Sequence, residues 1–235
     1  MINSFKKQAK KLYVKYFREG RYIKKGITCS RMWLGNDYGG FFVCPDYLNP
    51  KSVVYSFGIG TDISFSKALI AQFDCQVFGF DPTPKSIEWL KNQTLPTGLQ
   101  IFDFGIDKTT GLVKFYLPKN PDFVSGSLAA QSNVSTEKGI MVKMKRLFDI
   151  ANELGHKSID VLKLDVEGSE YEVLDDVLDS DLQIGQVLIE FHGRFVPDGK
   201  LKTISAIKKL QMKGYDVFAI SDSYEEVSFI RRDLL

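Results

Sequence analysis

The sequence predicts an α/β domain whose mostly parallel sheet ends in an antiparallel hairpin. From Ser52 onward, short apolar runs typical of buried strands alternate with amphipathic stretches typical of helices. The first of these strands leads into the glycine turn Gly58-Ile59-Gly60. The last two predicted strands, 215–220 and 227–230, are separated by only six residues, which is too few for a parallel crossover. This ending differs from the all-parallel dinucleotide-binding fold.

The chain begins with a basic amphipathic segment. Residues 2–17 place apolar side chains three and four positions apart with lysines between them, which predicts a helix. Its apolar stripe could pack on the domain, or the helix could dock on an anionic membrane surface or a membrane-bound partner through residues 1–20. Nucleic acid is not expected, because no base-stacking module accompanies the charge. We therefore expect an extension over 1–30 and one domain over 31–235.

The first half of the chain contains four apolar runs that predict strands, at 32–34, 41–44, 53–57 and 76–81. The first two runs flank a turn rich in glycine, asparagine and aspartate, so they are expected to form a small hairpin. An amphipathic stretch from about 62 to 73 separates the third run from the fourth and predicts a connecting helix. Thr83 followed by Pro84 is typical of a helix N-terminus and predicts a second helix.

The middle of the chain predicts three more strands. Residues 99–104 and 112–117 are separated by seven loop residues, so we expect these two strands to pair antiparallel. Residues 159–164 form the next apolar run. Ser169 and Glu172 then have the spacing of a capping box, which predicts the start of a helix.

The C-terminal part predicts one more strand and helix before the final hairpin. The strand covers 187–191. Apolar residues with helical spacing run from Leu201 to Leu210, and Gly214 is expected to end that helix.

The net charge of +2 conceals two regions of opposite charge. Residues 1–31 hold ten lysines and arginines against one acid, whereas 160–181 hold nine acids against one base. An apolar content of 44% excludes a mainly disordered chain, and no uncharged stretch exceeds 14 residues, which excludes a membrane-spanning segment. Three cysteines without a C-x-x-C pair predict neither a disulfide framework nor a zinc site. Without an apolar leader, we expect a cytoplasmic protein, placed at the inner membrane surface if the extension docks there.

The glycine turn stands where a strand passes into a helix, which is the position of a nucleoside-cofactor loop. Gly58 permits the tight turn, and Gly60 lets a ligand approach the helix N-terminus. Asp81 follows Gly60 by 21 residues, at the end of the next strand, where an acid can accept the hydroxyls of a ribose. A glycine turn with a helix-capping acid would give the same pattern without any ligand.

The residues of this loop distinguish two classes of cofactor. A pyrophosphate requires a third glycine and the open positive end of the helix, where Asp62 would repel it. S-adenosylmethionine carries no phosphate, and its amino and sulfonium groups are compatible with an acidic loop. The loop therefore predicts S-adenosylmethionine and disfavours an NAD-dependent oxidoreductase.

Four titratable residues follow two neighbouring strand ends. Asp165 and Glu167 come directly after the strand at 159–164, and strand alternation places Glu190 and His192 on one side. We expect all four side chains to converge beside the cofactor. Methyl transfer to a hydroxyl releases a proton, and a histidine oriented by a carboxylate is suited to accept it. The sequence therefore predicts His192 as the base, with the three carboxylates as its catalytic neighbours.

Two other interpretations of these residues stay open. Asp165, Glu190 and His192 could bind a divalent metal ion that lowers the pKa of the acceptor hydroxyl, although their spacing is not diagnostic. Glu167, and more strongly Glu170, could simply complement the positive end of the following helix.

Several blocks of the chain resemble the FkbM-type methyltransferases, a branch of the class I S-adenosylmethionine-dependent superfamily. The most specific block, 162–174, is similar to the lysine-hydrophobic-aspartate-x-glutamate-glycine signature of that family. The loop at 55–60, the strand end at 80–82 and the segment 31–43 with its Asn-Asp-x-Gly-Gly turn also match. The resemblance extends from about Arg31 to the C-terminus.

This resemblance implies a Rossmann-like three-layer sandwich with a seven-stranded sheet, and a cofactor held at the ends of its strands. The expected cofactor-binding residues are Ser56, Gly58, Gly60, Asp62, Asp81, Pro82, Gly105, Ile106 and Asp165. The chain departs from the family pattern at Ser56, where an acid usually stands, and at Asp62, where a small residue is usual. The family is associated with O-methylation of hydroxyls on sugars, glycans and polyketides.

The leading hypothesis is thus an O-methyltransferase that acts on a hydroxyl of a sugar, a glycan or a related small molecule. The alternative is a non-catalytic relative that keeps the fold as a binding module docked to a membrane or partner, and Ser56 is its best support.

Overall fold

The computed structural model describes residues 19–119, 126–128 and 134–235. Its centre is a sheet of seven strands in the order β11-β12-β10-β9-β3-β4-β5. Every neighbouring pair is parallel except those made by β12, which is antiparallel to both β10 and β11. The strands, in sheet order, are Tyr215–Ile220, Glu226–Arg231, Gln183–Glu190, Ser158–Leu164, Val53–Phe57, Gln76–Phe80 and Leu99–Phe102. The seven-stranded sheet with a terminal hairpin, as predicted, is confirmed.

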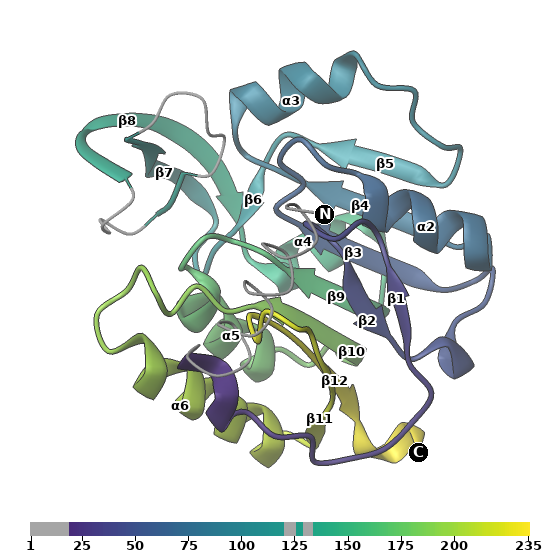
Figure 1. Ribbon diagram of the computed structural model, residues 1–235. Coiled ribbons are helices and arrows are strands. Elements are labelled where there is room, and N and C mark those ends of the chain that lie inside the picture. Colours follow the sequence, from purple (N-terminus) through teal and green to yellow (C-terminus); the bar gives the residue numbers. More distant parts are fainter. Residues whose placement is uncertain (1–18, 120–125, 129–133) are drawn as a thin grey trace, which may run out of the picture.

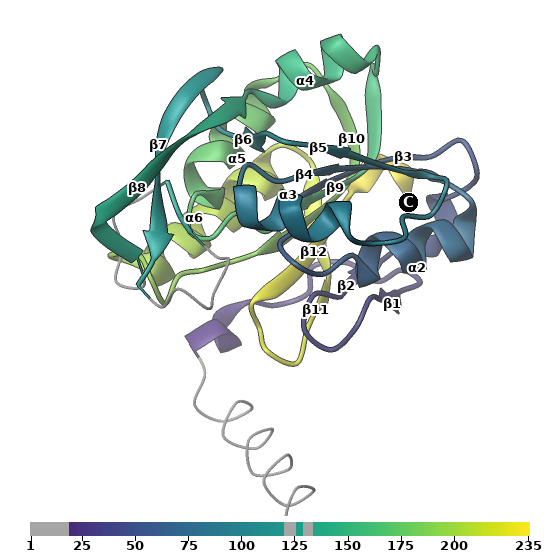
Figure 2. The same cartoon turned by 90° about the horizontal axis from the view of Figure 1, so that it is seen from above.

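Helices cover both faces of this sheet and make a three-layer sandwich (Figures 1 and 2). One apolar cluster packs the sheet against α4 (Leu147–Leu154), α5 (Glu170–Asp179) and α6 (Gly199–Met212). The other packs its opposite face against α2 (Ser64–Phe73) and α3 (Pro84–Lys91). Because the central strands are buried on both faces, apolar residues dominate their sequences, which made them recognisable.

A small antiparallel hairpin covers the sheet on the side of α2. Its strands are β1 (Met32–Leu34) and β2 (Phe41–Val43), as predicted. Phe41 and Val43 are fully buried in the same cluster as α2 and α3. The turn between the two strands is therefore fixed on the body of the domain.

The predicted antiparallel pairing of 99–104 with 112–117 is wrong. β5 ends at Phe102 and pairs with β4. β7 (Gly111–Pro118) pairs instead with β8 (Val134–Lys145), a strand that the sequence analysis did not predict, and β8 also pairs with β6 (Gly105–Ile106). Figure 1 shows β7 and β8 as an arm beside the main sheet. The arm forms because β8 offers β7 a long antiparallel ladder, whereas the chain leaves the main sheet after β5.

The helix predicted after Gly168 is confirmed as α5, but its capping box is not. The Ser169 side chain makes no capping hydrogen bond, and its hydroxyl is buried without a hydrogen-bond partner in the described part of the chain. Glu172 forms an ion pair with Lys108 instead of reaching back to the helix start. The carboxylate of Glu170 accepts the backbone N–H of Gly168 at 2.8 Å.

The helix predicted over 2–17 lies outside the described residues. The described chain begins with a short 3-10 helix, Glu19–Tyr22, and the segment from Ile23 to Arg31 then runs along β11. Ile23 is buried in the core, and the N–H groups of Gly26 and Ile27 donate to Val217 O at 2.8 and 3.3 Å. Packing on the domain thus begins before the predicted boundary at residue 30. No helix within the described ranges is long and apolar enough to cross a bilayer.

The first prediction concerns Gly58, which has a φ of +77° and lies against the chain after β9. A Cβ at this position would stand 1.7 Å from the carbonyl oxygen of Asp165. We expect Gly58→Ala to lower the free energy of unfolding by about 3 kcal/mol or more, because it adds a backbone clash to the left-handed strain. Urea denaturation measures this change.

Gly155→Ala is the matched control. Gly155 has a φ of +73°, but a Cβ there meets nothing within 4 Å. This variant should lose only about 1–2 kcal/mol, the cost of left-handed backbone for an alanine. Equal losses in the two variants would contradict the proposed clash.

Candidate active site

A pocket of about 1510 Å³ opens at the carboxyl ends of the parallel strands. All the residues that the sequence analysis selected line it: Ser56, Gly58, Gly60, Asp62, Asp81, Pro82, Gly105, Ile106, Asp165, Glu167, Glu190 and His192. They come from the ends of β3, β4, β9 and β10 and from β6. The structure therefore brings the two predicted groups together, because parallel strands end at one edge of the sheet.

The cofactor loop is tied to the next strand by a buried carboxylate. Asp81 accepts the N–H of Gly60 through Oδ2 at 2.8 Å and the N–H of Thr83 through Oδ1 at 2.8 Å. Thr83 is the N-cap residue of α3 with Pro84 directly after it, as predicted, but its hydroxyl donates to Asp81 and makes no capping hydrogen bond. On the other side of the loop, a Cβ at Gly60 would meet nothing within 4 Å. The loop thus presents open space to a ligand on a rigid support.

Asp62 joins this loop to the β1–β2 turn. Its Oδ1 accepts the N–H of Ser64 at 2.8 Å, and its Oδ2 accepts the side-chain amide of Asn36 at 2.8 Å. The Asn36 N–H in turn donates to the Ser64 hydroxyl at 3.0 Å. The acid that departs from the family pattern therefore organises the start of α2, and its contact with a cofactor stays a prediction.

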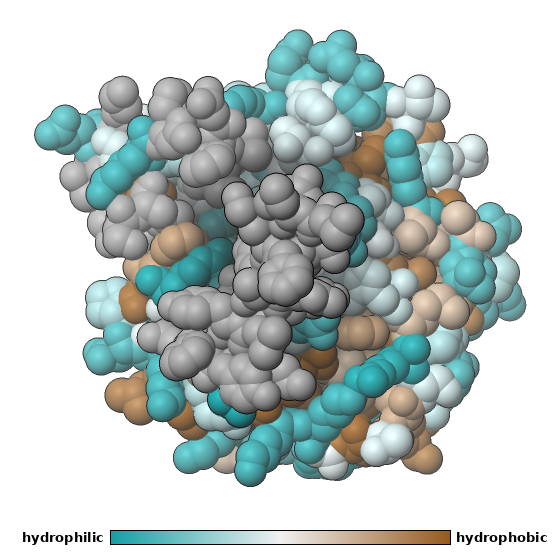
Figure 3. All heavy atoms as spheres, viewed as in Figure 1, coloured by the Kyte–Doolittle hydropathy of each residue, from teal (hydrophilic) through white to brown (hydrophobic). Residues whose placement is uncertain are grey.

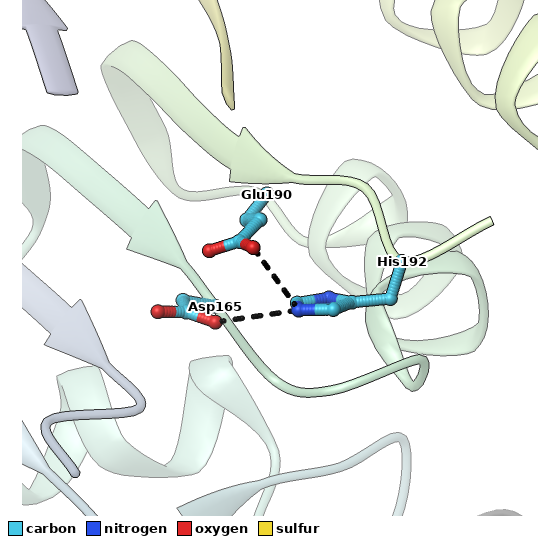
Figure 4. A group of neighbouring side chains, drawn as sticks. All are labelled: Asp165, Glu190 and His192. Atoms are coloured by element: carbon cyan, nitrogen blue, oxygen red, sulfur yellow. Dashed lines mark ion pairs between the residues drawn. The ribbon is translucent and has the colours of Figure 1, made fainter. Parts of the chain in front are cut away.

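His192 lies among four carboxylates at the ends of β9 and β10. Its Nε2 is 3.3 Å from Glu190, 3.5 Å from Glu167 and 3.8 Å from Asp165, and its Nδ1 is 3.7 Å from Glu170. Figure 4 shows Asp165 and Glu190 directed at the same ring nitrogen. The predicted convergence of Asp165, Glu167, Glu190 and His192 is present in the structure.

Glu170 fixes the backbone of His192 within this cluster, a role that was not predicted from the sequence. It stands in the first turn of α5, as the helix-end interpretation expects, but its side chain is fully buried. One carboxylate oxygen accepts the backbone N–H of His192 at 2.7 Å, and the other accepts the N–H of Gly168. Because His192 is 22 residues away in sequence, no local pattern could indicate this contact.

The burial and charges of this cluster shift its protonation. Burial alone would lower the pKa of His192, but the carboxylates of Glu170 and Glu190 outweigh it and raise that pKa well above the usual value. Burial and the negative charge of Asp165 raise the pKa of Glu190 to about 7. The carboxylates around His192 therefore favour its protonated form. Glu167 has a φ of +52°, a strained backbone of the kind found at functional sites.

Lys163 connects this cluster to the cofactor loop. Its ammonium is buried, donates to Gly58 O at 3.0 Å and lies 3.3 Å from Oδ2 of Asp165. Lys163 belongs to the block that matches the family signature, but no role was predicted for it from the sequence. Its signal was a lysine near the buried end of a strand, where a charge requires buried partners.

Two further walls of the pocket were not identified from the sequence. The arm contributes Phe115, Leu128 and Met144, which line the pocket together with Gly105 and Ile106. The other wall consists of the turn of the β1–β2 hairpin, 37–39, and the turn between β11 and β12, 221–226. The pocket thus has an apolar end at the arm and a mixed end at the two turns.

The arrangement can also be considered as a metal site. Ligand atoms of Asp165, Glu190 and His192 lie within 4.8 Å of one another. Two carboxylates and an imidazole suit a divalent cation, provided that the imidazole is neutral. The surrounding carboxylates raise the pKa of His192, so a metal ion and the imidazole proton would compete for this site.

Comparison with known proteins identifies the family. The model of the methyltransferase FkbM domain matches residues 56–219, which is well over half of the chain. A human protein named "probable methyltransferase-like protein 24" is 28% identical over 200 residues, which cover 79% of this chain and 47% of that protein.

Two microbial relatives match over shorter stretches. The 2-O-methyltransferase NoeI of Sinorhizobium fredii is 24% identical over 181 residues, covering 66% of this chain and 74% of that protein. The hexuronic acid methyltransferase AglP of Haloferax volcanii is 26% identical over 152 residues, covering 64% and 61%.

The chain spans about half the length of the mammalian relatives that it matches. The matched family region contains the glycine turn, Asp81 and the whole cluster around His192. On this match, and in agreement with the fold, the chain belongs to the FkbM methyltransferase family.

Proposed function

We propose that this protein is an S-adenosylmethionine-dependent O-methyltransferase whose acceptor is a hydroxyl of a sugar, a glycan or a related small molecule. The observation that carries the proposal is the carboxylate cluster around His192, which shares one pocket with the glycine turn of a methyltransferase-family sheet. The names of NoeI and AglP support O-methylation and a sugar acid as the acceptor type in relatives.

The cofactor half of the pocket fits a nucleoside. Gly60 leaves open space beside Asp81, and Pro82, Gly105 and Ile106 line the same pocket beyond it. When bound, S-adenosylmethionine supplies a methyl group on a positively charged sulfur. The carboxylate of Asp165, 20% exposed, lies at the centre of the pocket, where its negative charge would favour that cation.

The chain must also accept the proton of the attacking hydroxyl. The sequence analysis assigned this role to His192, but that side chain is only 1% exposed and its ring nitrogens face carboxylates. The Glu190 side chain is 16% exposed and lines the pocket beside it. We therefore propose that Glu190 accepts the proton of the hydroxyl. His192, in its protonated form, then holds the carboxylates of Asp165, Glu167 and Glu190 in place.

A divalent metal at Asp165, Glu190 and His192 is the second way to activate the hydroxyl. The protonated imidazole disfavours it, because a metal ligand must give up its proton. Membrane contact is a separate proposal, which rests on the ten basic residues within 1–31 and their amphipathic spacing.

The second prediction tests the role of Glu190. Glu190→Gln removes the proton acceptor but keeps the shape, so turnover with [methyl-³H]S-adenosylmethionine and a panel of methyl glycosides should fall about 100-fold or more. The dissociation constant for the cofactor, measured by isothermal titration, should change little. Glu88→Gln is the control, since Glu88 is exposed on α3 and pairs only with exposed Lys91 in the described structure.

Two results would contradict these assignments separately. Wild-type turnover in Glu190→Gln would remove Glu190 from the reaction. Absence of any heat with S-adenosylmethionine would contradict the enzyme itself and leave the non-catalytic binding module.

The third prediction concerns metal. Activity should survive EDTA, and added Mg²⁺ or Mn²⁺ should not increase it. The reason is that the carboxylates favour a protonated His192, and a protonated imidazole cannot act as a metal ligand. Loss of turnover in EDTA that Mg²⁺ restores would instead assign Asp165, Glu190 and His192 as ligands.

The fourth prediction concerns residues 1–20. In a sedimentation assay, the full chain should bind vesicles containing phosphatidylserine, and raising the salt from 50 to about 300 mM should weaken that binding. Deletion of residues 1–20 should abolish it. Vesicle binding that is unchanged after this deletion would refute the docking proposal.

A further inference from the structure

The pocket is larger than one small ligand requires. Its volume of about 1510 Å³ exceeds the roughly 300–1,000 Å³ typical of a site for one small molecule. The cofactor loop, Asp81 and Gly105 define one part of it. The remaining part lies beyond Glu190, between the β1–β2 turn and the β11–β12 turn. Both turns fall outside the residues matched by the family model, 56–219.

Tyr38 stands out in this second part. Seven large apolar side chains of the described chain are strongly exposed, and Tyr38, at 81%, is the one among them that lines the pocket. On the face of the molecule seen in Figure 3, apolar residues are interspersed with hydrophilic ones. The other six are Leu112, Met141, Phe148, Leu201, Met212 and Leu235.

Hydrogen bonds hold the backbone at Tyr38 in place. Oδ1 of Asn36 accepts the N–H groups of Tyr38 and Gly39 at 2.7 and 2.8 Å. The same side chain donates to Asp62 at the start of α2. The turn is therefore locked to the cofactor loop, and a ligand that stacks on the ring would order little additional chain.

Tyr38 and the carboxylates of the reaction cluster line the same pocket. Shielding from water, followed by the charges of Glu167, Asp165 and Glu190, raises the pKa of Tyr38 above its usual value. Tyr38 is thus close enough to these carboxylates for their charges to act on it, while most of its surface stays exposed.

The β11–β12 turn, 221–226, lines the same pocket and is polar. The hydroxyls of Ser221 and Ser223 are 2.8 Å apart and both donate to Glu226. Glu226 is the cross-strand neighbour of Glu190. An aromatic ring that shares one pocket with hydroxyl and carboxylate groups matches a molecule with one apolar face and a rim of hydroxyls. A pyranose ring has both, because its axial C–H bonds form an apolar face.

We propose that Tyr38 is the platform on which the acceptor sugar stacks, with the polar turn 221–226 binding its hydroxyl rim and one hydroxyl directed at Glu190. This inference rests on the proposed function and narrows its acceptor to a pyranoside. Stacking on an aromatic ring contributes modestly to affinity and strongly to orientation.

The experiment compares Tyr38→Ala with Tyr38→Phe. Phe148→Ala is the control, since it removes a partly exposed ring from α4, outside the pocket. The probes are the methyl glycosides of glucose, mannose and glucuronic acid, with catechol as a planar competitor. Saturation-transfer NMR on the complex with S-adenosylhomocysteine identifies the glycoside that binds, and titration gives its dissociation constant.

Tyr38→Ala should weaken glycoside binding about fivefold to tenfold, whereas Tyr38→Phe and Phe148→Ala should stay within about twofold of wild type. The dissociation constant for S-adenosylmethionine should be unchanged in all three variants. If Tyr38→Ala binds the glycoside as wild type does, or if the cofactor-loaded protein binds catechol but no glycoside, the platform is refuted. Failure of the wild type to bind S-adenosylmethionine would overturn the proposed function itself, together with this inference.

Discussion

A single buried imidazole, surrounded by carboxylates, organises the functional end of this protein. The imidazole of His192 lies within 3.8 Å of carboxylates from three neighbouring segments: the end of β9, the first turn of α5 and the end of β10. These carboxylates favour a proton on His192, because without a positive charge between them four acids would face one another in a largely buried space, where like charges are costly. Breaking a buried ion pair by removing one partner typically costs about 3–5 kcal/mol. The contacts between His192 and these carboxylates therefore contribute to the stability of the fold, apart from any role in the reaction.

The same constraint extends to the cofactor loop through Lys163. Its ammonium bridges Gly58 and Asp165, and at Gly58 the two segments are too close for any side chain. Asp81 joins the loop to the strand on its other side. The proposed cofactor half is thus built from backbone and buried charges on rigid strands, whereas the proposed acceptor half is built from turns. This division agrees with the family match, which contains the first half and excludes both turns.

Prediction from the sequence succeeded where one physical signal was sufficient. β3 and β9 are rich in apolar residues, and the short link before β12 requires a hairpin, so these elements were located almost to the residue. Asp165 and Glu190 were found because each stands at the end of such a strand. β8 was missed because its apolar residues Ile140, Val142 and Met144 occupy one face of a half-exposed ladder. The role of Glu170 was missed because its partner is supplied by tertiary structure.

The segment between Ile23 and Arg31 has a consequence for self-association. β11 is the outermost strand of the main sheet, and such strands offer unpaired backbone groups to other chains. Here Gly26 and Ile27 donate to Val217, while Ile27 and Cys29 pack with the buried cluster around Phe218. The segment shields this border of the sheet against pairing with a second molecule. A cut placed beyond Gly26 would therefore leave the catalytic residues in place and create an aggregation-prone protein.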